Sequence, residues 1–203
     1  MRSIRFPLVA ALILSASSSL GQNAPPAVAR ATIESVSADR STLAVRTRQG
    51  AEQAIRLGAK TRYVLVAPAA LADVKPGAFI GVAAMPGENG ELKAMDVHIF
   101  PEAMRGTGEG FRPYDLAPGS TMTNGNIDAR VDSVSGPKLT VSYKGGEKTI
   151  VVDPKTPIVV FEPGGESDLK PGAAILARGP KADDGTIDAA FVLIDKDGLV
   201  PPM

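Results

Sequence analysis

Cysteine is absent from the 203 residues of this chain, and histidine occurs once, as His98. A chain without thiols forms no disulfide bond and no thiolate metal site. It also lacks the cysteine to which bacterial lipoproteins attach their lipid anchor. A single histidine excludes paired-histidine zinc motifs such as His-Glu-x-x-His. These absences exclude disulfide scaffolds, zinc-finger sites and the common zinc hydrolase motif.

Motifs of other common enzyme classes are absent too. The sequence holds no Gly-x-Ser-x-Gly nucleophile elbow. Its glycine-rich segment, Gly106–Gly110, is not followed by Lys-Ser/Thr, so it is not a phosphate-binding loop. We therefore expect no enzymatic activity and no cofactor. A carboxylate-dependent enzyme stays open, because two acidic side chains far apart in sequence can converge in space.

Neither sign of charge is in excess, since 22 Lys and Arg face 22 Asp and Glu. A nearly neutral chain gains little from neutralising phosphates, so nucleic acid is not an expected partner. The six Phe and three Tyr are scattered and Trp is absent. The stacking platform of single-strand-binding barrels is therefore poorly supplied.

The apolar stretch near the N-terminus, Phe6–Leu14, is shorter than the roughly 20 residues that span a bilayer. It follows Arg2 and Arg5 and precedes small residues up to Gly21, which is the order of a secretory signal peptide. The alternative, a buried N-terminal helix, is disfavoured by the serines in this region. We therefore expect residues 1–21 to be removed by a signal peptidase. Because no later segment is apolar enough to span a membrane, the expected product is a periplasmic or secreted bacterial protein.

The chain repeats itself. A shift of 95 positions lays residues 49–99 onto 144–194 without gaps, and 17 of the 51 columns are then identical. The clearest match is Asp73–Ala78 (Asp-Val-Lys-Pro-Gly-Ala) with Asp168–Ala173 (Asp-Leu-Lys-Pro-Gly-Ala). Upstream, Ala31–Val36 resembles the segment 98 positions further on. Self-similarity of this kind predicts two copies of one structural unit.

Each copy is predicted to form short strands, because apolar and polar residues alternate with a period of two. In the first copy the expected strands are 31–37, 42–47, 52–57, 62–66, 78–85 and 92–100. In the second they are 129–135, 138–143, 147–152, 158–161, 173–178 and 186–194. A small sheet leaves exposed edges unless it closes on itself. The expected fold class is therefore all-β, with two tandem small OB-like β-barrels (similar to the oligonucleotide/oligosaccharide-binding fold) related by the repeat. The expected domains are a signal peptide 1–21, a first barrel 29–100, a connector 101–126, a second barrel 127–196 and a flexible tail 197–203.

Turn signals separate the expected strands. The dipeptides Asn89-Gly90, Gly145-Gly146 and Asp184-Gly185 favour hairpins, because these residues tolerate positive φ. The segments Pro68–Asp73 and Pro163–Asp168 are predicted to form short helical turns before each Lys-Pro-Gly step.

A candidate metal site lies at the end of the first copy. Asp96 and His98 are two residues apart on an expected strand and therefore share a face. Together with Met104 or Glu102 they form a candidate ligand set, and imidazole and thioether groups suit a periplasmic cation such as copper. The alternative is a surface histidine hydrogen-bonded to its neighbour. The second copy has Phe191 and Leu193 at these positions. That apolar pair is either covered by the connector or the other barrel, or binds an outside partner.

The connector is the expected recognition site, because it gathers planar cations, an aromatic ring and carboxylates in a short stretch. The alternative is that these groups clamp the two barrels together through Arg–carboxylate pairs. The residues concerned are Arg105, Glu109, Arg112, Tyr114 and Asp115.

Two features resemble a known group of sequences. The first is the repeated step Asp73–Ala78 and Asp168–Ala173, followed by a strand, a turn and a closing strand. The second is the connector, Glu102–Gly110 and Pro118–Asn124, together with Pro201–Met203 at the C-terminus. Over the whole chain after the signal peptide, they resemble uncharacterised exported proteobacterial proteins with tandem small β-barrel domains of unknown function. Some of these are labelled "metal transporter permease", but a permease needs spanning helices, which this sequence lacks.

The sequence thus predicts a non-catalytic, exported binding or interaction module of the bacterial cell envelope. Its partner is expected to be an envelope protein or a small ligand. The alternative is a periplasmic, copper-type metal-binding protein that uses His98, Asp96 and methionines.

Overall fold

A computed structural model describes residues 26–134, 136–196 and 198–199. Within these ranges the regular structure is β-strands and one-turn 3-10 helices, which confirms the all-β prediction. The strands are β1 (Ala27–Val36), β2 (Thr42–Thr47), β3 (Glu52–Pro68), β4 (Phe79–Pro86), β5 (Leu92–Ile99), β6 (Gly110–Pro113), β7 (Thr121–Val131), β8 (Lys138–Tyr143), β9 (Gly146–Val151), β10 (Ile158–Pro163), β11 (Ala174–Gly179) and β12 (Ile187–Asp195). The 3-10 helices are η1 (Leu71–Asp73), η2 (Glu88–Gly90), η3 (Glu102–Met104) and η4 (Glu166–Asp168). None of the described helices has the length and hydropathy of a membrane span. The predicted signal peptide, residues 1–21, lies outside the described residues.

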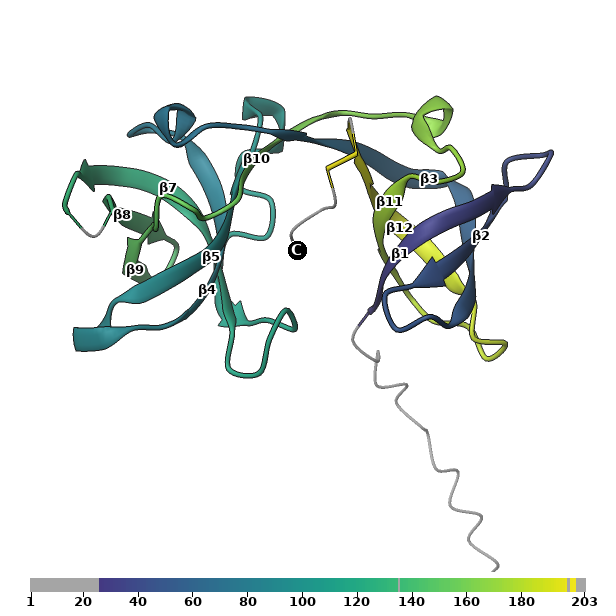
Figure 1. Cartoon of the computed structure of the whole chain (residues 1–203), viewed down its shortest axis with the longest axis horizontal. Coiled ribbons are helices and arrows are strands. Elements are labelled where there is room, and N and C mark those ends of the chain that lie inside the picture. The colour runs from purple at the N-terminus through teal and green to yellow at the C-terminus, as the bar shows by residue number, and fades with distance from the viewer. Residues whose placement is uncertain (1–25, 135, 197, 200–203) are drawn as a thin grey trace, which may run out of the picture.

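The strands close into two five-stranded barrels (Figure 1). The β1 barrel has the order β1-β2-β3-β12-β11, and β11 pairs with β1 to complete the ring. The β7 barrel has the order β7-β8-β9-β5-β4, and β4 pairs with β7. In both rings one contact is parallel, β3 with β12 and β5 with β9, and the others are antiparallel. The closed barrels expected from the sequence are therefore confirmed.

The barrels do not coincide with the two copies of the repeat. The β1 barrel combines β1–β3 from the first copy with β11 and β12 from the second. The β7 barrel combines β7–β9 from the second copy with β4 and β5 from the first. The expected boundaries need correction, because residues 29–100 and 127–196 each contribute three strands to one barrel and two to the other. The chain crosses between barrels twice.

The two crossings pair with each other. The C-terminal part of β3 runs antiparallel to β10, with Val66 opposite Phe161. These two residues are 95 positions apart, which is the shift of the repeat. In Figure 1, β3 extends from the β1 barrel towards the β7 barrel, and β10 lies against it and against β5. Around this pair of strands, the side chains between the barrels form a third apolar cluster: Val64, Val66, Val159, Phe161, Leu176 and Leu193.

The third strand differs between the copies. The first copy was expected to break between residues 57 and 62, but β3 runs through this region with only a register shift opposite Ala189 and Phe191. The second copy is interrupted there, between β9 and β10. It has Pro154 and Pro157 in the interruption, where the first copy has Ala59 and Arg62. Proline donates no ladder hydrogen bond, so it ends β9 where the equivalent strand continues.

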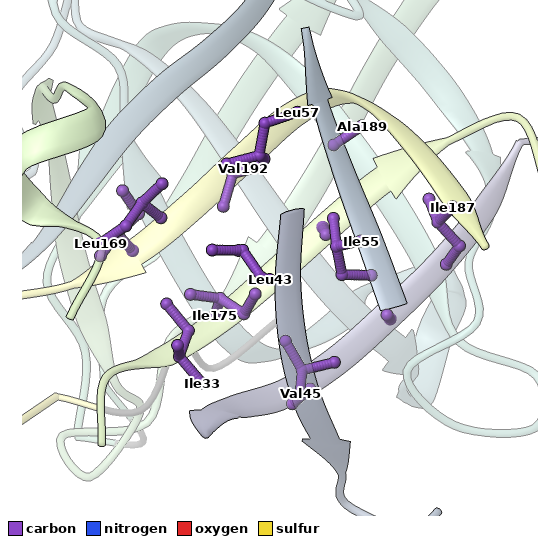
Figure 2. Packing of buried hydrophobic residues seen from close by; sticks show 14 residues of the cluster. Ile33, Leu43, Val45, Ile55, Leu57, Leu169, Ile175, Ile187, Ala189 and Val192 are labelled. Atoms are coloured by element: carbon purple, nitrogen blue, oxygen red, sulfur yellow. The ribbon is translucent and has the colours of Figure 1, made fainter. Parts of the chain in front are cut away.

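The core of each barrel also contains the aliphatic residue that precedes a Lys-Pro-Gly segment. In each barrel this residue comes from the copy that supplies only two of the five strands. Leu169, from the second copy, is buried in the β1 barrel among Ile33, Leu43 and Ile175 (Figure 2). Val74, from the first copy, is buried in the β7 barrel. Removing such an aliphatic side chain from water contributes about 1.5–3 kcal/mol. The strand exchange is therefore stabilised by both cores.

The two Lys-Pro-Gly segments form equivalent backbone hydrogen bonds. Gly172 N–H donates to Ile33 O at 2.8 Å, and Gly77 N–H donates to Ile127 O at 2.7 Å. Ile33 and Ile127 are therefore equivalent, at a shift of 94 positions. This corrects the resemblance of Ala31–Val36 to the segment 98 positions further on, which is four residues out of structural register.

The predicted turns are confirmed. Helices η1 and η4 occupy the two expected helical turns, and in η1 the Asp73 carboxylate accepts the N–H of Ala70 at 2.9 Å. Asn89 and Gly90 have φ values of 53° and 79°, as the turn between β4 and β5 requires.

The connector is shorter than the predicted range 101–126. It contains the short edge strand β6, and β7 starts at Thr121, eight residues before the strand expected at 129. The first residues of β7 are polar, which suggests a loop, yet Thr123 and Asn124 are 0% and 5% exposed. They are buried because β4 pairs on one side of β7 and β6 on the other.

Candidate functional site

Three neighbouring strands of the β7 barrel bring His98, Gly81 and Asn124 side by side. Gly81 on β4 pairs with His98 on β5 and with Asn124 on β7. Val82 and Val97 belong to the barrel core, so the alternate residues His98, Gly81 and Asn124 face outward. A methyl group at Gly81 would lie 2.9 Å from Asn124 Oδ1 and 3.1 Å from His98 Nδ1. Glycine therefore leaves the space in which the imidazole and the amide approach each other.

Asp96 and His98 form a buried pair and not a surface pair. They are 0% and 1% exposed, and Asp96 Oδ1 lies 2.7 Å from His98 Nε2. Asp96 Oδ1 also accepts the N–H of Ala83 at 3.3 Å. The imidazole stacks on the ring of Phe161 on β10, with ring centroids 5.6 Å apart. The proximity expected from the sequence is thus present, but the pair lies between the barrels.

The structure does not support the predicted metal site. Among the described residues, no group of three or more His, Asp and Glu side chains is placed to hold a metal ion. Met104 lines the same cavity as His98, whereas Asp96 does not line it. The expected ligands therefore do not face one common space.

A cavity of about 120 Å³ lies between the two barrels and the connector. Most of its wall is apolar, and buried side chains such as Phe161, Leu176 and Leu193 form part of it. Phe191 and Leu193 thus face the space between the barrels; Leu193 is buried there, as the packing interpretation expects, whereas Phe191 is only half-buried. The lining residues are Val28, His98, Phe100, Met104, Thr107, Arg112, Tyr114, Met122, Asn124, Phe161, Leu176, Arg178, Phe191 and Leu193.

Two arginines give one side of this cavity a positive charge. Arg112 on β6 is half-buried and donates from Nη1 to Gly108 O at 2.7 Å, and Arg178 on β11 is exposed. Neither guanidinium forms an ion pair within the described part of the chain. Burial, together with the nearby charge of Arg178, lowers the pKa of Arg112. Thr107 also lines the cavity and, like Arg178, is exposed, so we take the exposed part of the lining to be the mouth.

Two of the predicted connector residues form side-chain hydrogen bonds within the connector or to the β7 barrel, and they do not line the cavity. Arg105 Nε donates to Glu102 Oε1 at 2.6 Å and Arg105 Nη2 donates to Gly77 O at 3.1 Å. Glu109 Oε1 accepts the backbone N–H of Lys144 at 2.9 Å. Neither residue crosses to the β1 barrel, so neither acts as the expected clamp.

Asp115 does join the connector to the β1 barrel. Arg30 on β1 donates from both terminal nitrogens to the two oxygens of Asp115, at 2.9 and 3.0 Å. The Arg30 guanidinium also lies 6.0 Å from the centre of the Tyr114 ring. The clamp interpretation thus fits Asp115, whereas Arg112 and Tyr114 line the cavity. The five predicted residues therefore fall into three separate environments.

Replacing Asp115 by Asn is expected to lower stability by about 1 kcal/mol at pH 7, or about 2–4 °C in Tm, because the bidentate pair is half exposed. The hydrogen bonds from Arg30 hold the pKa of Asp115 below its ordinary value. A lowered pKa stabilises the folded state above the unfolded pKa of about 3.9, and the stabilisation is lost as the pH falls through the folded pKa. The Tm difference between wild type and variant should thus shrink below about pH 4.

Thermal melts from pH 7 to pH 2.5 measure this difference. Asp183→Asn is the matched control, since Asp183 is exposed and its substitution should leave Tm unchanged at every pH. A difference for Asp115→Asn that stays constant down to pH 2.5 would show that the Arg30 ion pair does not stabilise the fold.

Several lining residues were not predicted, although the repeat contains a signal for some of them. At the outward-facing positions that line the space between the barrels, the two copies carry different residues. Gly81 corresponds to Leu176 and Ala83 to Arg178, just as His98 corresponds to Leu193. A systematic comparison of outward positions would have found Arg178. Asn124 has no such signal, because it lies in the polar segment that was predicted as a loop.

Comparison with known proteins adds one match. No curated protein and no solved structure matches the chain significantly. Neither a tandem arrangement of domains nor the permease label of the resembling sequences finds support here. A family model described as "Domain of unknown function (DUF5666)" matches residues 127–192, from within β7 to within β12.

Proposed function

We propose that this chain is a non-catalytic binding module of the bacterial cell envelope, and that it binds a small ligand in the cavity between its barrels. The observation that carries the proposal is the cavity itself, a space of about 120 Å³ lined by aromatic and aliphatic side chains with polar groups at defined positions. Ligand sites generally combine an apolar lining with few, well-placed polar groups.

Unpartnered polar atoms support a ligand at this place. Asn124 Oδ1 is buried and has no hydrogen-bond partner among the described residues, while Nδ2 of the same amide donates to Thr107 O at 2.9 Å. Both residues line the cavity. Because a buried polar atom without a partner is costly, such an atom beside a cavity favours a ligand that supplies the missing hydrogen bond.

Binding without catalysis is supported by the lining. None of the described lining residues is Asp or Glu, so the cavity does not offer the carboxylate pair of a hydrolase. Asp96 is fully buried beside His98 and does not line the cavity. We retain the periplasm or the outside of the cell as the proposed location, on the strength of the N-terminal sequence.

Ligand-detected and protein-detected NMR with a library of ring-sized compounds tests this function. Binders should shift the signals of lining residues such as Met122 and Leu193. Met104→Trp, which places a bulky ring at the connector wall of the cavity, should abolish binding. Phe111→Trp is the control, because Phe111 is exposed and does not line the cavity. If no compound shifts the lining residues, or if Met104→Trp binds as wild type does, the proposed site is wrong.

A further inference from the structure

The cavity has a charge of one sign and an apolar interior, and these two properties together restrict its ligand. At the mouth lie the guanidinium groups of Arg112 and Arg178, from β6 and β11. The buried part of the lining includes the side chains of Phe161 and Leu193, which are 4% and 1% exposed. A molecule that fits both ends needs an anionic group and an apolar body.

Neither Arg112 nor Arg178 forms an ion pair among the described residues. The connector carboxylate Asp115 accepts both terminal nitrogens of Arg30, and the charge of Arg178 acts on it only weakly. Asp96 does not line the cavity. The lowered pKa of Arg112, caused first by burial and then by the charge of Arg178, agrees with two like charges lying near each other at the cavity. A ligand carboxylate would relieve this repulsion and accept charge-assisted hydrogen bonds.

The size of the cavity sets the size of the apolar body. At about 120 Å³ it is slightly smaller than an engineered apolar cavity of about 150 Å³ that holds one benzene molecule. Phe161 also presents its ring beside that of His98, with Phe100 edge-on at 5.0 Å. Aromatic side chains in such an arrangement accept a further ring by offset or edge contacts.

We infer that the cavity binds a small aromatic carboxylate, with its ring against Phe161 and its carboxylate at Arg112 and Arg178. This inference rests on the proposed function, since it names the class of ligand for the same site. An inorganic anion alone would leave the apolar interior unused, and a neutral ring would leave the two arginines unpaired.

Titration with three compounds of nearly equal shape tests the inference. Benzoate, benzamide and benzylamine share the ring and differ in charge, and two-dimensional NMR of the purified protein measures each Kd. We expect benzoate to bind at least about tenfold more tightly than benzamide, and benzylamine to bind most weakly. Arg112→Met and Arg178→Met should each weaken benzoate binding about tenfold, and change benzamide binding less than about twofold.

The control is Arg46→Met, because Arg46 is an exposed arginine of β2 that does not line the cavity. Arg178 is exposed, so its variant tests the charge even if Arg112→Met fails to fold. Equal binding of benzoate and benzamide, unchanged by either substitution, would overturn the anion assignment and leave the proposed function intact. If none of the three compounds shifts the lining residues, the inference fails together with the proposed site.

Discussion

Cleavage of the chain between Pro118 and Gly119 is expected to leave one particle with the mass of the intact protein. These residues are exposed in the connector, between β6 and β7, where a recognition sequence for a site-specific protease can be inserted. The cut separates the first copy of the repeat from the second. It does not separate the barrels, because each barrel contains strands from both sides of the cut.

The reason lies in the contacts that cross between the two fragments. Strand pairs β1–β11, β3–β12, β4–β7 and β5–β9 each join one fragment to the other, and β3–β10, β5–β10 and β6–β7 add three more. In the β1 barrel, Ile175 and Ile187 of the second fragment pack with Ile33 and Ile55 of the first. Since each buried aliphatic side chain contributes about 1.5–3 kcal/mol, dissociation would expose both cores at a cost the fragments cannot offset.

Size-exclusion chromatography with light scattering measures the outcome, before and after cleavage, in buffer and in denaturant. We expect co-elution at the intact mass in buffer and two half-sized chains in denaturant. The uncleaved chain with the same insertion is the control. Two tandem barrels, each built from one copy of the repeat, would instead separate into halves in buffer. That result would refute the exchange of strands.

The exchange could not be predicted from the repeat, although the strands themselves could. The alternation of Leu43 and Val45 with polar neighbours identifies a barrel strand, and Asn89-Gly90 identifies the turn between β4 and β5. These signals are local. The repeat predicts which types of strand pair, but not which copy supplies each strand. Gly77 donates to Ile127 and Gly172 to Ile33, and exchanging the two isoleucines would give equivalent hydrogen bonds within each copy.

The unbroken length of β3 is the feature of the chain that indicates the exchange of strands between the barrels. A strand that runs from Glu52 to Pro68 without a sharp bend carries the chain out of the β1 barrel, so β4 and β5 must close the other one. The absence of proline at positions 59 and 62 of the first copy permits this. This absence can be recognised as informative only by comparison with Pro154 and Pro157 of the second copy.

The candidate site was predicted in part, and for physical reasons. Asp96 and His98 were placed together because residues two apart share a face of a strand. Arg112 and Tyr114 were singled out by residue type, and both line the cavity. The partners across the cavity were not predicted, because Arg178 and Leu193 belong to the opposite barrel. Sites formed between units depend on how the units meet, which no local pattern encodes.

Replacement of Gly179 by Ala is expected to lower stability by at least about 3 kcal/mol, which corresponds to about 6–12 °C in Tm. A methyl group at Gly179, the last residue of β11, would lie 1.9 Å from Asp188 O and 2.8 Å from its carbonyl carbon. Both are backbone atoms of β12, so no side-chain rotation relieves the overlap. The N–H of Asp188 is itself held, because it donates to Pro180 O at 2.9 Å.

The methyl group would therefore push β12 away from β11, and so strain the strand pair that the second copy contributes to the β1 barrel. Thermal melts followed by circular dichroism measure the loss. Gly58→Ala is the matched control, since Gly58 is an exposed glycine of β3 with no atom within 4 Å of an added methyl group and no positive φ. Its Tm should stay within about 2 °C of wild type. A Gly179→Ala protein that melts with the Gly58→Ala control would mean that β11 and β12 are not packed as closely as the structure has them, and that the barrel tolerates a looser closure.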